Sequence, residues 1–222
     1  MINSYNEISR SFFPDVLYVG EAKLPEGLVQ PEGAVHSVES ESGRQLLRLM
    51  IDQKFNHAPP VFKTPKYEKP SVRVGNEVIS ISFTHTKSRV AGVVSGQWVV
   101  GIDMESGSRE VNEQLSKRMK HPAESLKFYE NHPIIQIWTM KEAVLKAIGT
   151  GLRKPMNSVC ITKNSDYLFS VTLFNGSRAQ LCSFQLNDHW TSICYIEPSQ
   201  SEQLLSDDYV PFQTGRNPNQ TG

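Results

Sequence analysis

Val100-Gly101-Ile102-Asp103-Met104-Glu105 has the pattern of a buried strand that ends in acidic residues. In extended geometry successive side chains alternate between the two faces of a sheet. We therefore expect Gly101, Asp103 and Glu105 to share one face, with Val100 and Ile102 on the other. A glycine just before the two acids also predicts room for a ligand to approach the sheet backbone.

The strongest helical pattern in the chain runs from Ile134 to Ile148, and Gly149-Thr150-Gly151 is predicted to end it. Apolar residues recur on one face and form its core stripe: Ile137, Met140, Val144 and Ile148. A separate stripe at i, i+4 and i+8 consists of Trp138, Glu142 and Lys146, with Lys141 beside it. The strand and the helix together supply three carboxylates and two lysines from rigid elements.

The remaining patterns predict an α+β fold. A second helix is expected over 37–55, and a polar helical stretch over 108–128 is broken at His121-Pro122. Strands are expected over 78–85, 89–94 and 97–103, then as a meander over 159–162, 167–174, 178–186 and 189–196. Ser95-Gly96 and Asn175-Gly176 have the composition of hairpin turns. The first 35 residues are weakly patterned, and the prolines over 59–70 predict a long loop.

Composition excludes several classes of protein. The 222 residues carry no formal net charge, so the basic surface of a general nucleic-acid binder is not expected. No apolar run reaches the ~20 residues of a membrane span, and the first residues lack the pattern of a secretion signal. Cys160, Cys182 and Cys194 have no metal-type spacing. We expect reduced cysteines and a cytoplasmic protein.

Asp103, Glu105 and Glu142 are candidate ligands of a divalent cation. Carboxylate oxygens suit Mg²⁺ or Mn²⁺, with phosphate oxygens and water completing the shell. Lys141 and Lys146 would neutralise the remaining phosphate charge. Taken singly, each fragment also has an ordinary explanation. An Asp-x-Glu after a strand is often a helix start, and Glu142 with Lys146 is a common helix ion pair worth ~0.3–0.5 kcal/mol.

The two motifs together resemble the signature of the 4′-phosphopantetheinyl transferases. In that family an aliphatic-Gly-aliphatic-Asp segment is followed by an aromatic, a small residue, any residue, Lys-Glu, Ala or Ser, two more residues, and Lys. Val100 to Asp103 and Trp138 to Lys146 fit every constrained position, and Gly149-Thr150-Gly151-Leu152 is similar to the family's next turn. The resemblance extends over about 44–174.

Three further elements are similar to family motifs and would bind coenzyme A. Phe83-Thr84-His85-Thr86 resembles a Ser-His-Ser element that contacts the phosphates, with a threonine hydroxyl in place of serine. Lys69-Pro70 resembles a Gly-Lys-Pro segment near the adenosine, although Glu68 replaces the glycine. Arg44 or Arg48 could match an upstream arginine. His85 could equally be a packed histidine, and the two arginines a solvated helix face.

The resemblance implies a large, monomeric type of transferase, which activates peptide and siderophore synthetases. Its fold would be two similar α+β halves related by a pseudo-twofold axis, here 1–100 and 101–200, with the ligand between them and a flexible tail over 201–222. The reaction would be that of a holo-[acyl-carrier-protein] synthase, moving phosphopantetheine from coenzyme A to a serine of an apo acyl or peptidyl carrier. The carrier could serve fatty-acid, polyketide or peptide synthesis, or lysine biosynthesis.

In that reaction Mg²⁺ would be held by Asp103, Glu105 and Glu142, with 3′,5′-ADP released. Glu142 would take the serine proton, Lys146 would stabilise the leaving diphosphate, and Lys141 would reach a phosphate from the rim. A basic cluster, defined here as Lys117, Arg118 and Lys120, would dock the acidic carrier, with Met119 or Leu115 as an apolar contact; a solvated helix face is the ordinary alternative.

Two other functions remain open at this point. Acid clusters paired with Lys-Glu also occur in metal-dependent nucleases and phosphodiesterases. A non-catalytic coenzyme A-binding module would use the same nucleotide contacts, although it would not need all three acids.

Overall fold

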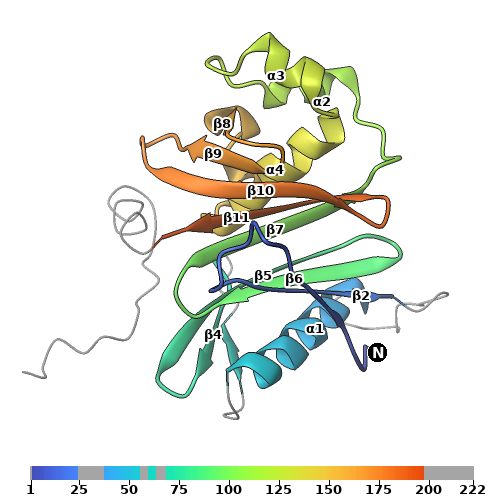
Figure 1. Ribbon diagram of the computed structural model, residues 1–222, viewed down its shortest axis with the longest axis vertical. Helices are drawn as coiled ribbons and strands as arrows, with labels where there is room; N and C mark the ends of the chain where they lie inside the picture. The colour runs from blue at the N-terminus through green and yellow to red at the C-terminus, as the bar shows by residue number, and fades with distance from the viewer. Residues whose placement is uncertain (1, 25–37, 56–59, 64–68, 198–222) are drawn as a thin grey trace, which may run out of the picture.

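Two antiparallel sheets, each with one long helix packed on it, form the two halves of the chain (Figure 1). The structure is a computed structural model, and it describes residues 2–24, 38–55, 60–63 and 69–197. This architecture confirms the expected α+β class with two similar halves. The predicted flexible tail over 201–222 and Ser37 lie outside the described residues.

The first half contains a six-stranded sheet in the order β1-β2-β6-β5-β4-β3. Its strands are β1 (Asn6–Ile8), β2 (Tyr18–Lys23), β3 (Val61–Lys63), β4 (Ser71–Val74), β5 (Glu77–His85) and β6 (Arg89–Ser95). Helix α1 (Val38–Lys54) packs on this sheet and matches the expected helix closely. Gly43 lies inside α1 because a Cβ there would meet the ring of Phe83 at 2.1 Å. The sequence patterns missed β1 to β4.

The second half contains a five-stranded sheet in the order β7-β11-β10-β9-β8. Its strands are β7 (Val99–Ser106), β8 (Cys160–Lys163), β9 (Leu168–Thr172), β10 (Arg178–Leu186) and β11 (His189–Ile196). The last four pair in succession, so the expected meander is confirmed. Its helices are α2 (Glu113–Met119), α3 (Leu126–Asn131) and α4 (Ile134–Ala147), followed by two 3₁₀ turns, η1 (Gly151–Arg153) and η2 (Met156–Ser158).

The two halves meet along β5 and β7 through side chains. Ser80, Ser82 and Thr84 alternate along β5, and their hydroxyl oxygens accept hydrogen bonds from the backbone N–H groups of residues 100, 102 and 104 at 3.0–3.3 Å. The outer edge of β7 is thereby satisfied without a neighbouring strand. The predicted hairpin of β6 with β7 is wrong, because β6 pairs with β2 and β5 while β7 joins the other sheet.

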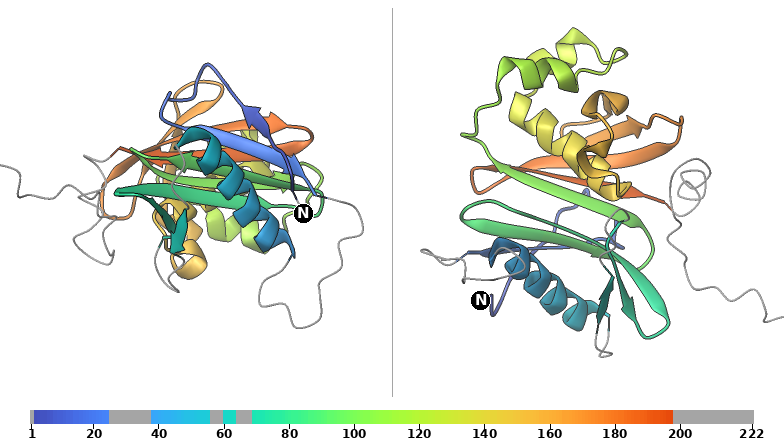
Figure 2. Two further views of the ribbon diagram at one scale, coloured as in Figure 1. Left: turned by 90° about the horizontal axis from the view of Figure 1, so that it is seen from below. Right: turned by 180° about the vertical axis from the view of Figure 1, so that it is seen from behind.

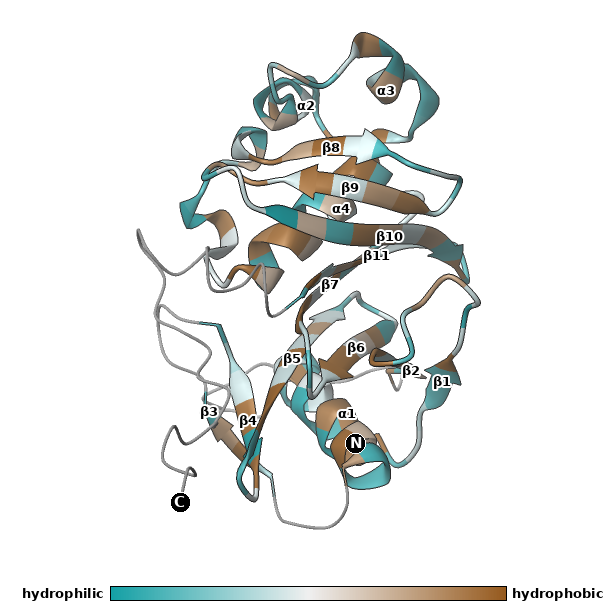
Figure 3. Ribbon diagram, turned by 60° about the vertical axis from the view of Figure 1, so that its left-hand side comes forward, coloured by the Kyte–Doolittle hydropathy of each residue, from teal (hydrophilic) through white to brown (hydrophobic). Residues whose placement is uncertain are grey.

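Three apolar clusters hold these layers together. One lies between α1 and the first sheet, one between α4 and the second sheet, and one between the two sheets. Figure 2 shows α1 and α4 on the outer sides of the paired sheets, and Figure 3 shows hydrophilic residues gathered on α2. The expected core stripe of α4 is at most 3% exposed. No helix among the described residues is long and apolar enough to cross a membrane, and the three cysteines are free.

Candidate active site

Gly101 determines how α4 meets β7. A Cβ at this position would lie 2.2 Å from the carbonyl oxygen of Ala143 and 2.4 Å from the amide nitrogen of Ala147. The glycine therefore admits the helix backbone onto the strand, and the expected room for a ligand at Gly101 is wrong. Because the helix comes so close, its next outward stripe, with Glu142 and Lys146, lies over the acidic end of β7.

Asp103 is the centre of the polar contacts in this region. Its side chain is almost fully buried, and its Oδ1 accepts hydrogen bonds from the Lys146 ammonium at 2.7 Å and the Thr84 hydroxyl at 3.1 Å. Three elements, β5, β7 and α4, thus meet on one carboxylate oxygen. The other oxygen, Oδ2, is buried and has no hydrogen-bond partner among the described residues. An unpaired buried carboxylate oxygen is costly unless a cation or donor reaches it.

Glu142 and Glu105 complete the acidic cluster. Burial, followed by the negative charge of Asp103, raises the pKa of Glu142 to about 7. Burial and then Asp103 also raise the pKa of Glu105. The Arg109 guanidinium forms an ion pair with Glu105 and lies 5.1 Å from the centre of the Trp138 ring. Arg109 was not singled out from the sequence, because a lone arginine in a polar loop carries no pattern.

His85 and Thr84 lie at the end of β5 beside this cluster. The pKa of His85 is lowered by partial burial, and the charges of Glu39, Lys146 and Asp103 also act on it. His85 is nevertheless an exposed residue at the end of β5, so the alternative of a packed core histidine is not supported. The structure therefore brings together the three acids, Lys146, Thr84 and His85, which come from both halves of the chain.

Comparisons with known proteins show what this part of the chain is similar to. Residues 99–194, from the first residue of β7 to Cys194 in β11, match the family described as the 4′-phosphopantetheinyl transferase superfamily. This chain is therefore similar to that superfamily over its second half. The 4′-phosphopantetheinyl transferase gsp of Aneurinibacillus migulanus is 26% identical over 199 residues, which cover 80% of this chain and 82% of that protein. The acids and Lys146 lie inside the matched range, whereas Thr84 and His85 lie before it.

Lys69 connects the two halves of the chain through its side chain. Its ammonium donates hydrogen bonds to the carbonyl oxygens of Ile81 in β5 and Lys146 at the end of α4, both at 3.2 Å. Gly149, with φ +77°, ends α4 directly against Lys69, and a Cβ there would lie 2.9 Å from the Lys69 Cβ. The Lys69 ammonium is therefore bonded to backbone carbonyl oxygens. This differs from the expectation that it would face coenzyme A.

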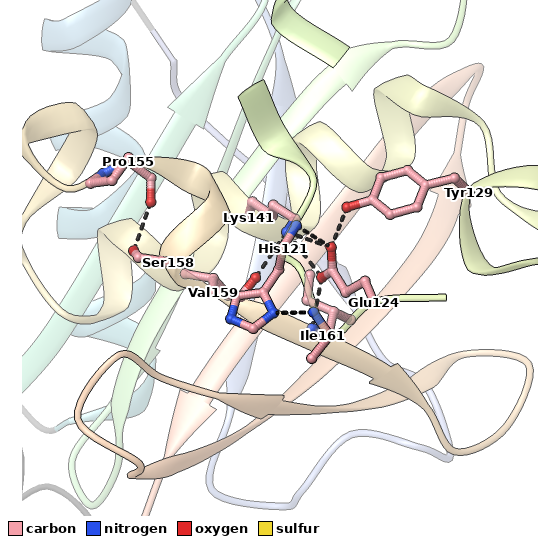
Figure 4. A network of polar contacts seen from close by, with 9 residues as sticks. His121, Glu124, Tyr129, Lys141, Pro155, Ser158, Val159 and Ile161 are labelled. Carbon is pink, nitrogen blue, oxygen red and sulfur yellow. Dashed lines mark hydrogen bonds and ion pairs between the residues drawn. The ribbon is translucent and has the colours of Figure 1, made fainter. Parts of the chain in front are cut away.

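Lys141 occupies a different environment from its neighbour Glu142. The side chain of Lys141 is fully buried, and its ammonium contacts both carboxylate oxygens of Glu124 at 2.9 Å and the Val159 carbonyl at 2.8 Å (Figure 4). The expectation that Lys141 reaches a phosphate from the rim is wrong in this structure. Glu124 was missed in the sequence because it follows the break at His121-Pro122 and lies 17 residues from its partner Lys141.

The remaining candidates lie on exposed helix surfaces. Arg44 and Arg48 both form ion pairs with Glu41 on α1, and Arg48 also lies 5.3 Å from the centre of the Phe62 ring. These contacts do not connect either arginine with Asp103. In the basic cluster, Lys117 pairs with Glu113 of the same helix, and Lys120 lies 5.0 Å from the Tyr129 ring centre.

The three acids alone do not supply a complete set of ligands for a divalent cation. Among the described residues, no three His, Cys, Asp or Glu side chains are arranged to hold a metal ion alone. Asp103 Oδ2 is nevertheless unpaired, and the pKa of Glu142 is raised by burial and then by the negative charge of Asp103, so a cation placed here would relieve repulsion. The donor set therefore fits a divalent cation only if phosphate oxygens of a substrate and water supply the other ligands.

Proposed function

We propose that the protein transfers 4′-phosphopantetheine from coenzyme A to a serine hydroxyl of an apo acyl or peptidyl carrier protein, with Mg²⁺ or Mn²⁺ as cofactor and 3′,5′-ADP as the second product. The observation that carries this proposal is Asp103, whose one carboxylate oxygen joins Thr84 and Lys146 while the other is buried and unpaired. The match of residues 99–194 to the 4′-phosphopantetheinyl transferase superfamily, and the similarity to the transferase gsp, support the transfer of phosphopantetheine.

The donor would lie along the line from His85 to Glu142. The exposed His85 and the buried Thr84 beside it, at the end of β5, would bind the phosphates at the adenosine end, as the family resemblance implies. Arg44 and Arg48 would contribute at longer range, because their contacts in this structure are with Glu41. Lys69 would act by fixing the end of α4 through the Lys146 carbonyl. In this proposal residues 1–100 supply the adenosine and phosphate contacts, and residues 101–200 supply the metal-binding acids. We also propose that the protein is a monomer.

The transfer would break one phosphoanhydride bond. The carrier serine oxygen bonds to the β-phosphorus, the bond from that phosphorus to the bridging oxygen breaks, and 3′,5′-ADP leaves with the electron pair. Glu142, with a pKa of about 7, would accept the serine proton near neutral pH. Lys146 would shift from Asp103 toward charge on the departing oxygen. Asp103, Glu105 and Glu142 would hold the cation, which would neutralise diphosphate charge.

Mass spectrometry of an apo carrier incubated with the protein, coenzyme A and Mg²⁺ tests this function. We expect the carrier to gain one phosphopantetheine, and the gain to disappear with Glu142→Gln. The wild-type protein should also form one equivalent of 3′,5′-ADP per carrier modified. An unmodified carrier in every member of a panel of acyl and peptidyl carriers, despite measurable coenzyme A binding, would leave only a binding module. Release of nucleotide from a phosphodiester instead would indicate a phosphodiesterase.

We also propose that the basic cluster docks the carrier. Lys117, Arg118 and Lys120 are all exposed on α2 and its end, so they suit the acidic surface of a carrier. Met119 is fully buried and cannot be the apolar contact, whereas Leu115 is partly exposed. Changing all three basic residues to Glu should raise the KM for the carrier and leave the affinity for coenzyme A unchanged. An unchanged carrier KM would refute this docking site.

A further inference from the structure

Glu124 is a buried carboxylate that accepts several hydrogen bonds. Besides Lys141, its two oxygens accept from the backbone N–H of His121 at 3.0 Å, the backbone N–H of Ile161 at 2.8 Å, and the Tyr129 hydroxyl (Figure 4). The side chains of Glu124 and Lys141 are both fully buried. Burying an ion pair is favourable only where its remaining hydrogen-bonding capacity is satisfied in this way.

The partners of Glu124 belong to four separate parts of the chain. His121 closes the turn after α2, Tyr129 is in α3, Lys141 is in α4, and Ile161 is in β8. The carboxylate therefore ties the segment over 107–131, which we name the α2–α3 segment, to the rigid helix and sheet behind it. Met119 and Phe128 also anchor this segment in the core, but they lie on either side of the turn that Glu124 fixes.

The basic cluster lies on this same segment, directly before that turn. Lys120 is the C-cap residue of α2, and His121 follows it with its backbone bonded to Glu124. Lys120 also lies over the ring of Tyr129, whose hydroxyl donates to Glu124. The orientation of the cluster thus depends on a carboxylate and a lysine that are both inaccessible to any ligand.

We propose that Glu124 and Lys141 are a positioning pair that holds the basic cluster in the orientation the carrier protein needs. The inference rests on the proposed function and assigns Lys141, the lysine of the family motif, a role through Glu124. It predicts that Lys141 acts on carrier binding and makes no contact with coenzyme A. The side chain of its neighbour Glu142 lies near Asp103 instead, where we propose that it binds the cation and accepts the serine proton.

A double-mutant cycle of Glu124→Gln, Lys141→Met and both together tests the pairing. We expect each change to raise the carrier KM about tenfold, equivalent to about 1.4 kcal/mol, with the coenzyme A KM within about twofold of wild type. The effects should not add, because the residues act as one unit. The double variant guards against misfolding, since it leaves no buried charge without a partner. Asp166→Asn, which removes an exposed ion pair with Lys163 outside the segment, is the matched control.

Amide hydrogen exchange of the substrate-free protein gives a readout that does not depend on transfer. Exchange in 113–131 should become at least about tenfold faster in the three variants and stay unchanged with Asp166→Asn. Tyr129→Phe, which removes one bond to Glu124 and leaves Lys141 in place, should give a smaller change in the same direction. If no carrier accepts phosphopantetheine from the wild type, the proposed function fails, and the exchange arm still decides whether the pair fixes the segment.

Three results would overturn the proposal. One is unchanged exchange over 113–131 in Glu124→Gln. Another is a Lys141→Met variant in which the coenzyme A KM rises or kcat falls while the carrier KM is unchanged, as expected of direct phosphate contact. The third is a return of the carrier KM to its wild-type value in the double variant, because the charged pair would then be dispensable.

Discussion

Replacing Gly101 with Ala would separate the two elements on which the site is built. The added Cβ would lie 2.2 Å from the Ala143 carbonyl oxygen, and a contact of 3.0 Å requires α4 to move by at least 0.8 Å. The obstacle is helix backbone, so no side-chain rotation can relieve it. Overpacking of this kind costs about 1–3 kcal/mol. We expect the free energy of unfolding in urea to fall by about that amount.

The same displacement would act on the chemistry. The Lys146 ammonium is 2.7 Å from Asp103 Oδ1, and a shift of about 0.8 Å would bring this contact to the limit of a hydrogen bond. Misplacing catalytic groups by about 1 Å costs roughly 100-fold in rate. Single-turnover transfer to a carrier, measured with saturating coenzyme A, should fall by about that factor.

A matched control is available in the turn between β6 and β7. A Cβ at Gly96 would lie 3.0 Å from a ring atom of Phe55, which can rotate away, and Gly96 lies before the first residue of β7, whereas Asp103 lies in its second half. Gly96→Ala should leave the transfer rate within about twofold of wild type. If Gly101→Ala retains both wild-type stability and wild-type rate, α4 does not lie against this glycine and the reasoning is refuted.

Three other measurements follow from the structure. Ser82→Ala leaves the buried N–H of Ile102 without its acceptor, so the free energy of unfolding in urea should drop by about 1–3 kcal/mol; a loss below about 0.5 kcal/mol would contradict the contact. Burial lowers the pKa of Lys69 from 10.5 to about 7, so between these two pH values the unfolded chain binds more protons than the folded one. The free energy of unfolding should therefore rise with pH over this range, by at most about 1.4 kcal/mol per pH unit. Lys69→Met should abolish this slope, and an equal slope in the variant would disprove the assignment. Because the pKa of Glu142 is raised to about 7, the affinity of the free protein for Mn²⁺ should weaken below that pH, as calorimetry can measure. Glu142→Gln should remove this pH dependence. A pH-independent affinity in the wild type would argue against Glu142 as a ligand.

The sequence predicted the elements whose patterns are long. Helix α4 and strands β10 and β11 agree with their expected limits because period and turn residues point to the same boundaries. Strands β1, β3 and β4 have only three or four residues, which is too short for alternation to stand out, and their structure depends on neighbours. The change of sheet between β6 and β7 was not visible, because a serine-glycine turn is compatible with either connection.

The site was predictable where family motifs place acids at fixed spacing. Asp103, Glu142 and Lys146 do meet in the structure, as their positions on β7 and α4 suggested. The environments of Lys69 and Lys141 could not be foreseen, because a lysine is exposed in most sequences and its burial requires partners that are distant in the chain. At Gly101 the sequence predicted a ligand, whereas the structure places the backbone of α4 there, because the contact again involves a segment distant in the chain. The missing side chain of the glycine indicates a close approach without saying what approaches.

The hydroxyls of β5 have a consequence for any attempt to divide the chain. Since Ser80, Ser82 and Thr84 are the acceptors for alternate amides of β7, a fragment starting near residue 97 would expose that row of donors along a long apolar strand. Such a fragment would tend to self-associate through β7. Co-expression of the complementary piece should suppress this aggregation, and the two-residue periodicity of the acceptors would fix the alignment in which the pieces recombine.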